Sequence, residues 1–128
     1  DGKSVLIALM DSTTRVSTMW NISADRSEKK QITGHRDGFY RYMALSPDGA
    51  LLVYAAMEEK RLGLWIMPAE GGPSLPLAVS REYNYECPAW SPDGKLLAYA
   101  SGKTGQGGIY VMEMDIGKII AELKALNR

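Results

Sequence analysis

Residues 90–101 read Trp-Ser-Pro-Asp-Gly-Lys-Leu-Leu-Ala-Tyr-Ala-Ser, and this stretch decides the fold because it recurs. Residues 45–56, Leu-Ser-Pro-Asp-Gly-Ala-Leu-Leu-Val-Tyr-Ala-Ala, have the same layout, and residues 1–9 form a shortened third copy that starts at its Asp-Gly pair. The three aspartates, Asp1, Asp48 and Asp93, are spaced 47 and 45 residues apart. A period of about 40–50 residues made of short strands is typical of a propeller or a repeat array.

Each copy predicts a tight turn followed by a buried strand. The Asp side chain can accept hydrogen bonds from backbone amides further along, Gly tolerates positive φ, and Pro biases the preceding Ser toward an extended conformation. The apolar runs after the turns, residues 4–9, 51–56 and 96–100, are short enough for strands that are buried on both faces. We therefore predict an all-β chain.

Further strands complete the repeat. Trp20, Trp65 and Tyr110 follow their aspartates by 19, 17 and 17 residues, and we expect these rings to pack between blades. Pro76 suits only an edge strand, as an outermost blade strand would be. The prediction is a single propeller segment, 1–128, of three four-stranded antiparallel blades: blade one 1–33, blade two 40–79 and blade three 85–124.

The end of the chain allows two interpretations. The repeat predicts a fourth strand at residues 118–123. The apolar residues Ile116, Ile119, Ile120 and Leu123, however, follow a helical stripe that Asp115 could cap. Because the sister blades share one plan, the strand is the preferred prediction.

Composition excludes several classes of function. Lys plus Arg and Asp plus Glu both total 15, which argues against a nucleic-acid partner, and no apolar run approaches the length of a membrane span. Cys87 is the single cysteine, so it excludes an internal disulfide, and we expect it to be a small core residue.

No catalytic set accompanies the repeat. His35-Arg36-Asp37 resembles a kinase catalytic loop only in three letters, and no Gly-x-Ser-x-Gly segment accompanies the single histidine. One Cys and one His exclude a soft metal site, whereas an oxygen-only calcium site stays open. We therefore predict no enzymatic activity, no cofactor and no metal.

The repeat resembles that of TolB-type β-propellers, in which Trp-Ser-Pro-Asp-Gly-Lys precedes an apolar strand and an Ile-Tyr-Val-Met strand. Residues 90–100 and 109–112 nearly match this pattern. The resemblance implies four-stranded blades, a periplasmic or secreted location, and binding at the loops that connect the blades. Closed propellers have four to eight blades, so three blades form a partial propeller or half of a six-bladed ring closed by dimerisation through open blade faces.

Two loops on that face combine aromatic residues with charges of both signs, as interface hot spots do. The predicted partner-binding residues are His35, Arg36, Asp37, Tyr40, Arg81, Glu82, Tyr83 and Tyr85. A competing interpretation is that the rings pack between blades while the charges keep the loops soluble.

The predicted function is a non-enzymatic module that binds a protein or peptide partner or acts as a scaffold. The alternative is the propeller part of a prolyl-oligopeptidase-like hydrolase whose catalytic domain lies outside this chain. A third possibility is an assembly unit without a ligand.

Overall fold

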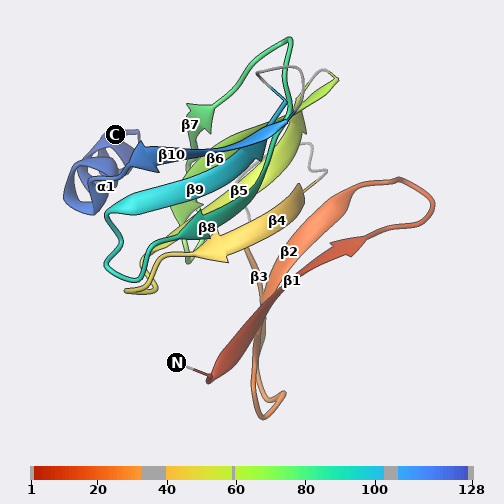
Figure 1. The fold of residues 1–128 in the computed structure, drawn as a ribbon. Coiled ribbons are helices and arrows are strands. Elements are labelled where there is room, and N and C mark those ends of the chain that lie inside the picture. Colours follow the sequence, from red (N-terminus) through yellow and green to blue (C-terminus); the bar gives the residue numbers. More distant parts are fainter. Residues whose placement is uncertain (1, 33–39, 59, 103–106, 127–128) are drawn as a thin grey trace.

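The computed structural model describes residues 2–32, 40–58, 60–102 and 107–126, and it contains three antiparallel sheets and one helix (Figure 1). Blade one comprises β1 (Ser4–Met10), β2 (Ser17–Ser23) and β3 (Lys29–Ile32). Blade two comprises β4 (Tyr40–Leu45), β5 (Leu51–Glu58), β6 (Arg61–Pro68) and β7 (Leu75–Ala78). Blade three comprises β8 (Tyr85–Trp90), β9 (Leu96–Ser101) and β10 (Gly108–Glu113), and α1 (Ile116–Ala125) follows it.

Within each sheet, strands that follow one another in sequence pair with one another, so each blade is a meander. The strand orders are β1-β2-β3, β4-β5-β6-β7 and β8-β9-β10. Three such sheets in one chain confirm the predicted all-β, propeller-type architecture. Among the described residues, only blade two has the full four strands.

The two Ser-Pro-Asp-Gly turns have identical hydrogen bonds. Ser46 Oγ donates to Asp48 Oδ1 at 2.6 Å, and the Ala50 N–H donates to the same oxygen at 3.0 Å. The Leu51 N–H in turn donates to Ser46 Oγ at 3.0 Å. Residues 91–96 repeat all three bonds at the same lengths. The turn chemistry expected from the sequence is confirmed.

Blade two supplies the centre of the core because both its faces are covered. Leu52, Tyr54 and Met67 pack with Met19 and Ile32 of blade one. On the opposite face, two clusters join blade two to blade three and α1. The first contains the buried residues Leu51, Val53, Ile66, Leu97, Met114 and Leu123, and the second contains Ala55, Leu62 and Leu64. Full burial on both faces, predicted for all three repeats, holds for β5; β1 and β9 each face an open side.

The end of the chain forms a helix, so the prediction of a strand at 118–123 is wrong. Asp115 caps α1 by accepting a hydrogen bond from the Lys118 N–H at 3.1 Å. Ile116, Ile119 and Ile120 pack against the cluster that contains buried Leu123. A strand would turn alternate side chains of this run away from the core, whereas a helix presents the whole stripe to it. Among the described residues, no helix is long and apolar enough to cross a membrane.

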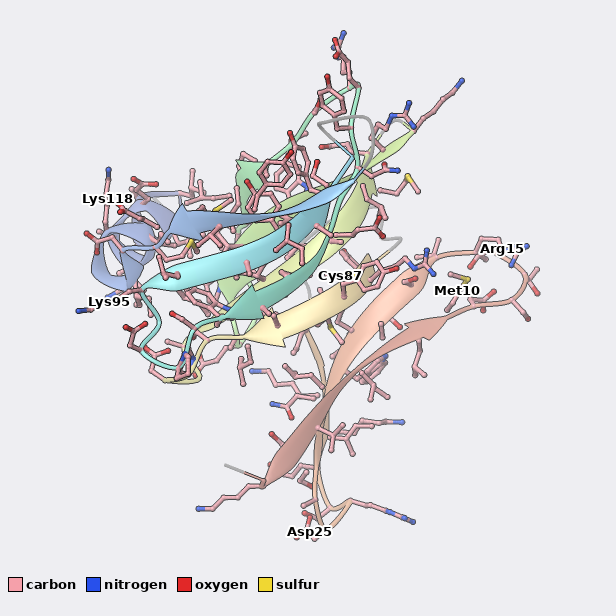
Figure 2. The ribbon with its side chains drawn as sticks, viewed as in Figure 1. Met10, Arg15, Asp25, Cys87, Lys95 and Lys118 are labelled. Carbon is pink, nitrogen blue, oxygen red and sulfur yellow. The ribbon has the colours of Figure 1, made fainter. Side chains whose placement is uncertain are left out.

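The prediction of a core position for Cys87 is also wrong, because the side chain is exposed (Figure 2). The register between β8 and β9 shifts between Glu86 and Ala89, and Cys87 adopts a positive φ of 55° within this bulge. A bulge leaves one residue without a partner in the ladder. Blade two has the same irregularity, where Tyr42 has a φ of 52°.

The predicted packing of the repeated rings holds in part. Trp65 packs against the cluster between blades one and two, and Tyr110 stacks on Tyr99 at 5.9 Å between ring centroids. Trp20 lies on the open side of blade one, where the Lys29 ammonium is 5.2 Å from its ring centroid. A different ring links two blades, because Trp90 Nε1 donates to the Ala44 carbonyl at 3.1 Å.

Truncating Leu97 tests the contact between blades two and three. Leu97 is fully buried among side chains from three elements, so Leu97→Ala leaves a cavity and is expected to cost about 2–5 kcal/mol of unfolding free energy. Urea unfolding followed by circular dichroism measures it. The matched control, Leu45→Ala, truncates an exposed leucine and should cost less than about 1 kcal/mol. Equal losses in both variants would contradict this packing.

Acid should weaken the turns. Hydrogen bonds from the Ser46 hydroxyl and then the Ala50 amide lower the pKa of Asp48, and those from Ser91 and Lys95 do the same to the pKa of Asp93. A carboxylate whose pKa is lower in the folded chain than in the unfolded chain stabilises the fold at pH values above its unfolded pKa of about 4. This stabilisation is lost as the pH falls through the pKa of the folded chain. The Tm of the wild type should therefore fall below about pH 4.

The double variant Asp48→Asn with Asp93→Asn should lose less Tm than the wild type between pH 5 and pH 2, since it has two fewer carboxylates to protonate. Thermal unfolding at a series of pH values measures both slopes. Glu122→Gln, a change on the exposed side of α1, serves as the control. If Tm falls equally with pH in the wild type and in the double variant, the turn carboxylates are not the source of the acid sensitivity.

Candidate binding surface

Two segments that connect strands lie at the same edge of blades two and three: the β5–β6 hairpin and the loop between β7 and β8. β5 ends at Glu58 and β6 starts at Arg61 there, because these two residues pair directly. The segment from residue 79 to residue 84 joins β7 to β8 at the same edge. Antiparallel pairing places it there, since β7 ends where β6 begins. We call this edge the loop rim.

A small pocket of about 290 Å³ opens on the loop rim. Its lining is Glu58, Lys60, Arg61 and Arg81, which we call the rim cluster. Among the residues that the structure describes, this lining contributes three cationic side chains and one carboxylate. Its size suits one side chain or a terminal carboxylate rather than a whole cofactor.

Polar contacts of the backbone fix the loop that carries Arg81. Ser80 Oγ accepts hydrogen bonds from the Glu82 and Tyr83 amides at 3.0 and 3.3 Å. Asn84 Oδ1 accepts from the Leu62 amide at 2.9 Å, which ties the loop to β6. Arg81 therefore lies in a loop whose following residues are held by hydrogen bonds, and it lines the same pocket as Lys60 and Arg61 of the β5–β6 hairpin.

The structure separates the residues that the sequence predicted for this surface. Arg81 and Glu82 are exposed on the rim, and Tyr83 is half-buried beside them. Tyr85 belongs to β8 and meets Tyr99 edge-on, with ring centroids 5.9 Å apart. Its ring is thus partly engaged in packing between blades two and three.

Tyr40 is the first residue of β4 and is buried. Its ring meets that of Tyr54 edge-on at 5.4 Å, inside the core between blades one and two. A partner on the loop rim would find little of this ring exposed. His35, Arg36 and Asp37 lie outside the described residues.

Sequence reasoning missed two features of the surface. The predicted partner-binding residues did not include Glu58, Lys60 or Arg61, and Asn84 was not assigned a role. The Lys60-Arg61 pair on a hairpin could have signalled the first. No local signal marks the second, because the Asn84–Leu62 bond joins residues 22 apart.

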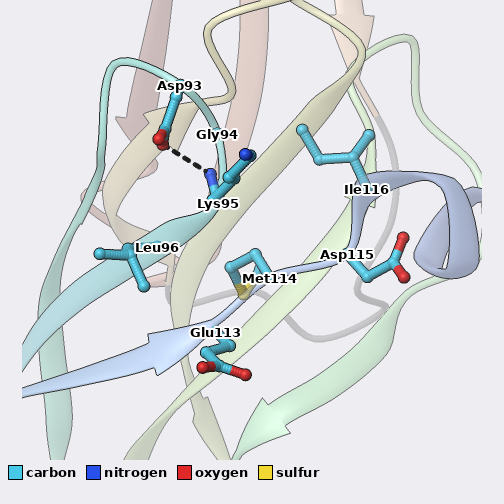
Figure 3. A pocket seen from close by; sticks show the side chains of 8 residues that line it. All are labelled: Asp93, Gly94, Lys95, Leu96, Glu113, Met114, Asp115 and Ile116. Atoms are coloured by element: carbon cyan, nitrogen blue, oxygen red, sulfur yellow. Dashed lines mark hydrogen bonds between the residues drawn. The ribbon is translucent and has the colours of Figure 1, made fainter.

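A larger hollow of about 670 Å³ lies at the opposite edge, between the second Ser-Pro-Asp-Gly turn and the start of α1 (Figure 3). Two of its three carboxylates already serve the fold: Asp93 accepts hydrogen bonds from Ser91 and Lys95, and Asp115 caps α1, whereas Glu113 also lines the hollow. Gly94, with a φ of +73°, lies so close to α1 that an added Cβ would meet Ile116 Cδ1 at 2.9 Å. The hollow therefore forms where the start of α1 packs against the turn that contains Gly94.

In the parts of the chain that the structure describes, no three His, Cys, Asp or Glu side chains are grouped so that they could hold a metal ion.

No family model matches the sequence, and no curated protein matches it either. Solved structures do match. A TolB-type protein of Agrobacterium tumefaciens superposes with a TM-score of 0.73 and 21% identity over 88% of this chain, which corresponds to 39% of that protein. TolB of Acinetobacter baumannii gives a TM-score of 0.70 and 16% identity over 88% of this chain and 27% of its own.

The isopeptidase AtxE2, solved with Astexin3-dC4 bound, matches less well, with a TM-score of 0.51 and 17% identity over 76% of this chain and 18% of its own. The chain spans less than half the length of each of these proteins. At these identities the likeness concerns the fold. The three sheets have the architecture of part of a TolB-like β-propeller, as the repeat predicted.

Removing the Asn84 anchor should loosen the rim cluster. Asn84→Ala leaves the Leu62 amide without its acceptor, and an unmade hydrogen bond of this kind costs about 1–3 kcal/mol. The amide of Leu62 should exchange with deuterium faster than in the wild type, while amides of β9 keep their rates. Asn84→Asp retains an acceptor oxygen and should stay close to the wild type. Unchanged exchange at Leu62 in Asn84→Ala would refute the anchoring role.

Proposed function

We propose that the chain is a non-enzymatic binding module that takes a protein or peptide partner on the loop rim. The observation that carries the proposal is the rim cluster, in which Lys60, Arg61 and Arg81 line one small pocket together with Glu58. A carboxylate from the partner would neutralise this cluster, and Arg can hold it by two parallel hydrogen bonds. The TolB-like fold of the chain is compatible with such a role.

Tyr83 is the aromatic residue best suited to assist. Its ring is half-buried, its amide is held by Ser80, and it lies two residues from Arg81. Tyrosine and arginine together are typical of interface hot spots. We include His35, Arg36 and Asp37 in the proposed surface because the sequence places their loop before β4, whose first residue lies at the same edge as the end of β5.

The proposed compartment is the periplasm or the outside of the cell, and this part of the proposal rests on the resemblance to TolB-type propellers. A scaffold role belongs to the same proposal. The hydrolase alternative has less support, because the isopeptidase matches with the lower TM-score and over a smaller share of this chain than the two TolB proteins do.

Binding of short labelled peptides, followed by fluorescence anisotropy, tests the proposal. The probes are peptides of one length that differ only in whether they contain glutamate or glutamine. We expect the acidic set to bind more tightly, and the double variant Arg61→Ala with Arg81→Ala to lose about tenfold or more in affinity. Salt should weaken binding of the acidic set, as it does for exposed charges.

Lys118→Ala is the matched control, because it removes an exposed cation from α1, away from the loop rim (Figure 2). It should bind the acidic peptides as the wild type does. Equal binding of glutamate and glutamine peptides, or an unaffected double variant, would reject the rim cluster as the binding site.

A further inference from the structure

The rim cluster combines groups of opposite charge that come from neighbouring segments. Glu58, the last residue of β5, pairs directly with Arg61, the first residue of β6, so their side chains lie on the same face of the hairpin. The loop that contains Arg81 is held against this hairpin, because Asn84 accepts a hydrogen bond from the Leu62 amide at 2.9 Å. A carboxylate and guanidinium groups therefore line one pocket of about 290 Å³.

Such a lining favours a ligand that both accepts and donates hydrogen bonds. Guanidinium groups only donate, and an ionised carboxylate only accepts. A carboxylate of the ligand would accept from Arg61 or Arg81, and an N–H group of the ligand would donate to Glu58. The C-terminal residue of a peptide carries both groups on one Cα atom.

We propose that the rim cluster binds the C-terminal residue of a peptide. The α-carboxylate of that residue pairs with the arginines, and its amide N–H donates to Glu58. The pocket is at the lower end of the range of about 300–1,000 Å³ that ligand sites occupy, which suits a single residue. This inference rests on the proposed function and names the part of the partner that the site takes.

Two other parts of a peptide fit the lining less well. The side chain of an internal glutamate offers a carboxylate to the arginines, but it has no N–H group for Glu58 and brings a like charge toward it. A peptide N-terminus offers an ammonium group to Glu58, but the cationic side chains of the described lining would repel it.

Fluorescence anisotropy with four peptides, labelled at the N-terminus and of one length, tests the proposal. A glutamate version and a glutamine version, differing at one internal position, are each made with a free C-terminal carboxylate and with a C-terminal amide. Within each version, the free-ended peptide should bind about tenfold more tightly, because the amide has no charge to pair with the arginines. The two amidated peptides repeat the test of the proposed function, in which glutamate binds more tightly than glutamine.

The contact with Glu58 is tested from both sides. A free-ended peptide that is N-methylated at its last residue cannot donate, so it should bind about tenfold more weakly, whereas N-methylation three residues earlier should have little effect. Glu58→Gln should also weaken binding of the free-ended glutamine peptide, since it removes the charge of the acceptor. Charge attraction alone predicts the opposite sign, because the variant removes an acid from a site for an anion.

The matched control is Lys95→Ala, which removes an exposed cation at the opposite edge of blade three and should bind all four peptides as the wild type does (Figure 2). Circular dichroism confirms that each variant keeps its strands. Equal affinity of free-ended and amidated peptides, with glutamate still preferred over glutamine, overturns this inference and leaves the proposed function intact. If neither a free end nor glutamate tightens binding, both are rejected. A Glu58→Gln variant that binds the free-ended peptide more tightly overturns the contact between Glu58 and the terminal amide.

Discussion

A small antiparallel sheet with two apolar faces cannot be stable alone, and this constraint governs the whole molecule. Blade two satisfies it fully, because blade one covers one face and blade three with α1 covers the other. The six consecutive buried residues at the start of β5 are the direct result. Blades one and three satisfy the constraint on one side only, so their exposed valines, leucines and isoleucines are concentrated on outward faces.

The repeat made the turns, the strand order and the central core predictable, since Ser-Pro-Asp-Gly fixes its turn through bonds within six residues. Features that depend on contacts between distant residues were not predictable. The strand proposed at 118–123 followed from analogy between blades, while the capping Asp115 and the packing of Leu123 decided for a helix. The exposed position of Cys87 depends on a mismatch in strand pairing, which has no signature in residue type.

The candidate surface shows the same division. The sequence grouped Arg81 and Glu82 with Tyr40 and Tyr85; the first two are exposed, whereas both tyrosine rings pack against other rings. A tyrosine near the first residue of a strand can either pack in the core or remain exposed for a partner, and its position in the sequence does not decide between the two. The rim cluster joins a hairpin to a loop about twenty residues later, so only the folded arrangement brings its charges together.

Tyr42 and Cys87 occupy the same position in successive blades, and both have a left-handed backbone conformation that residues other than glycine adopt at a cost. The first strands of blades two and three, β4 and β8, therefore contain the same kind of β-bulge although a tyrosine occupies one and a cysteine the other. Such kinks survive changes of residue because strand pairing imposes them. For protein engineering, these are the two strand positions in the described chain where a glycine would remove the backbone cost of positive φ, and the net gain is what remains after the extra entropy that glycine gives the unfolded chain.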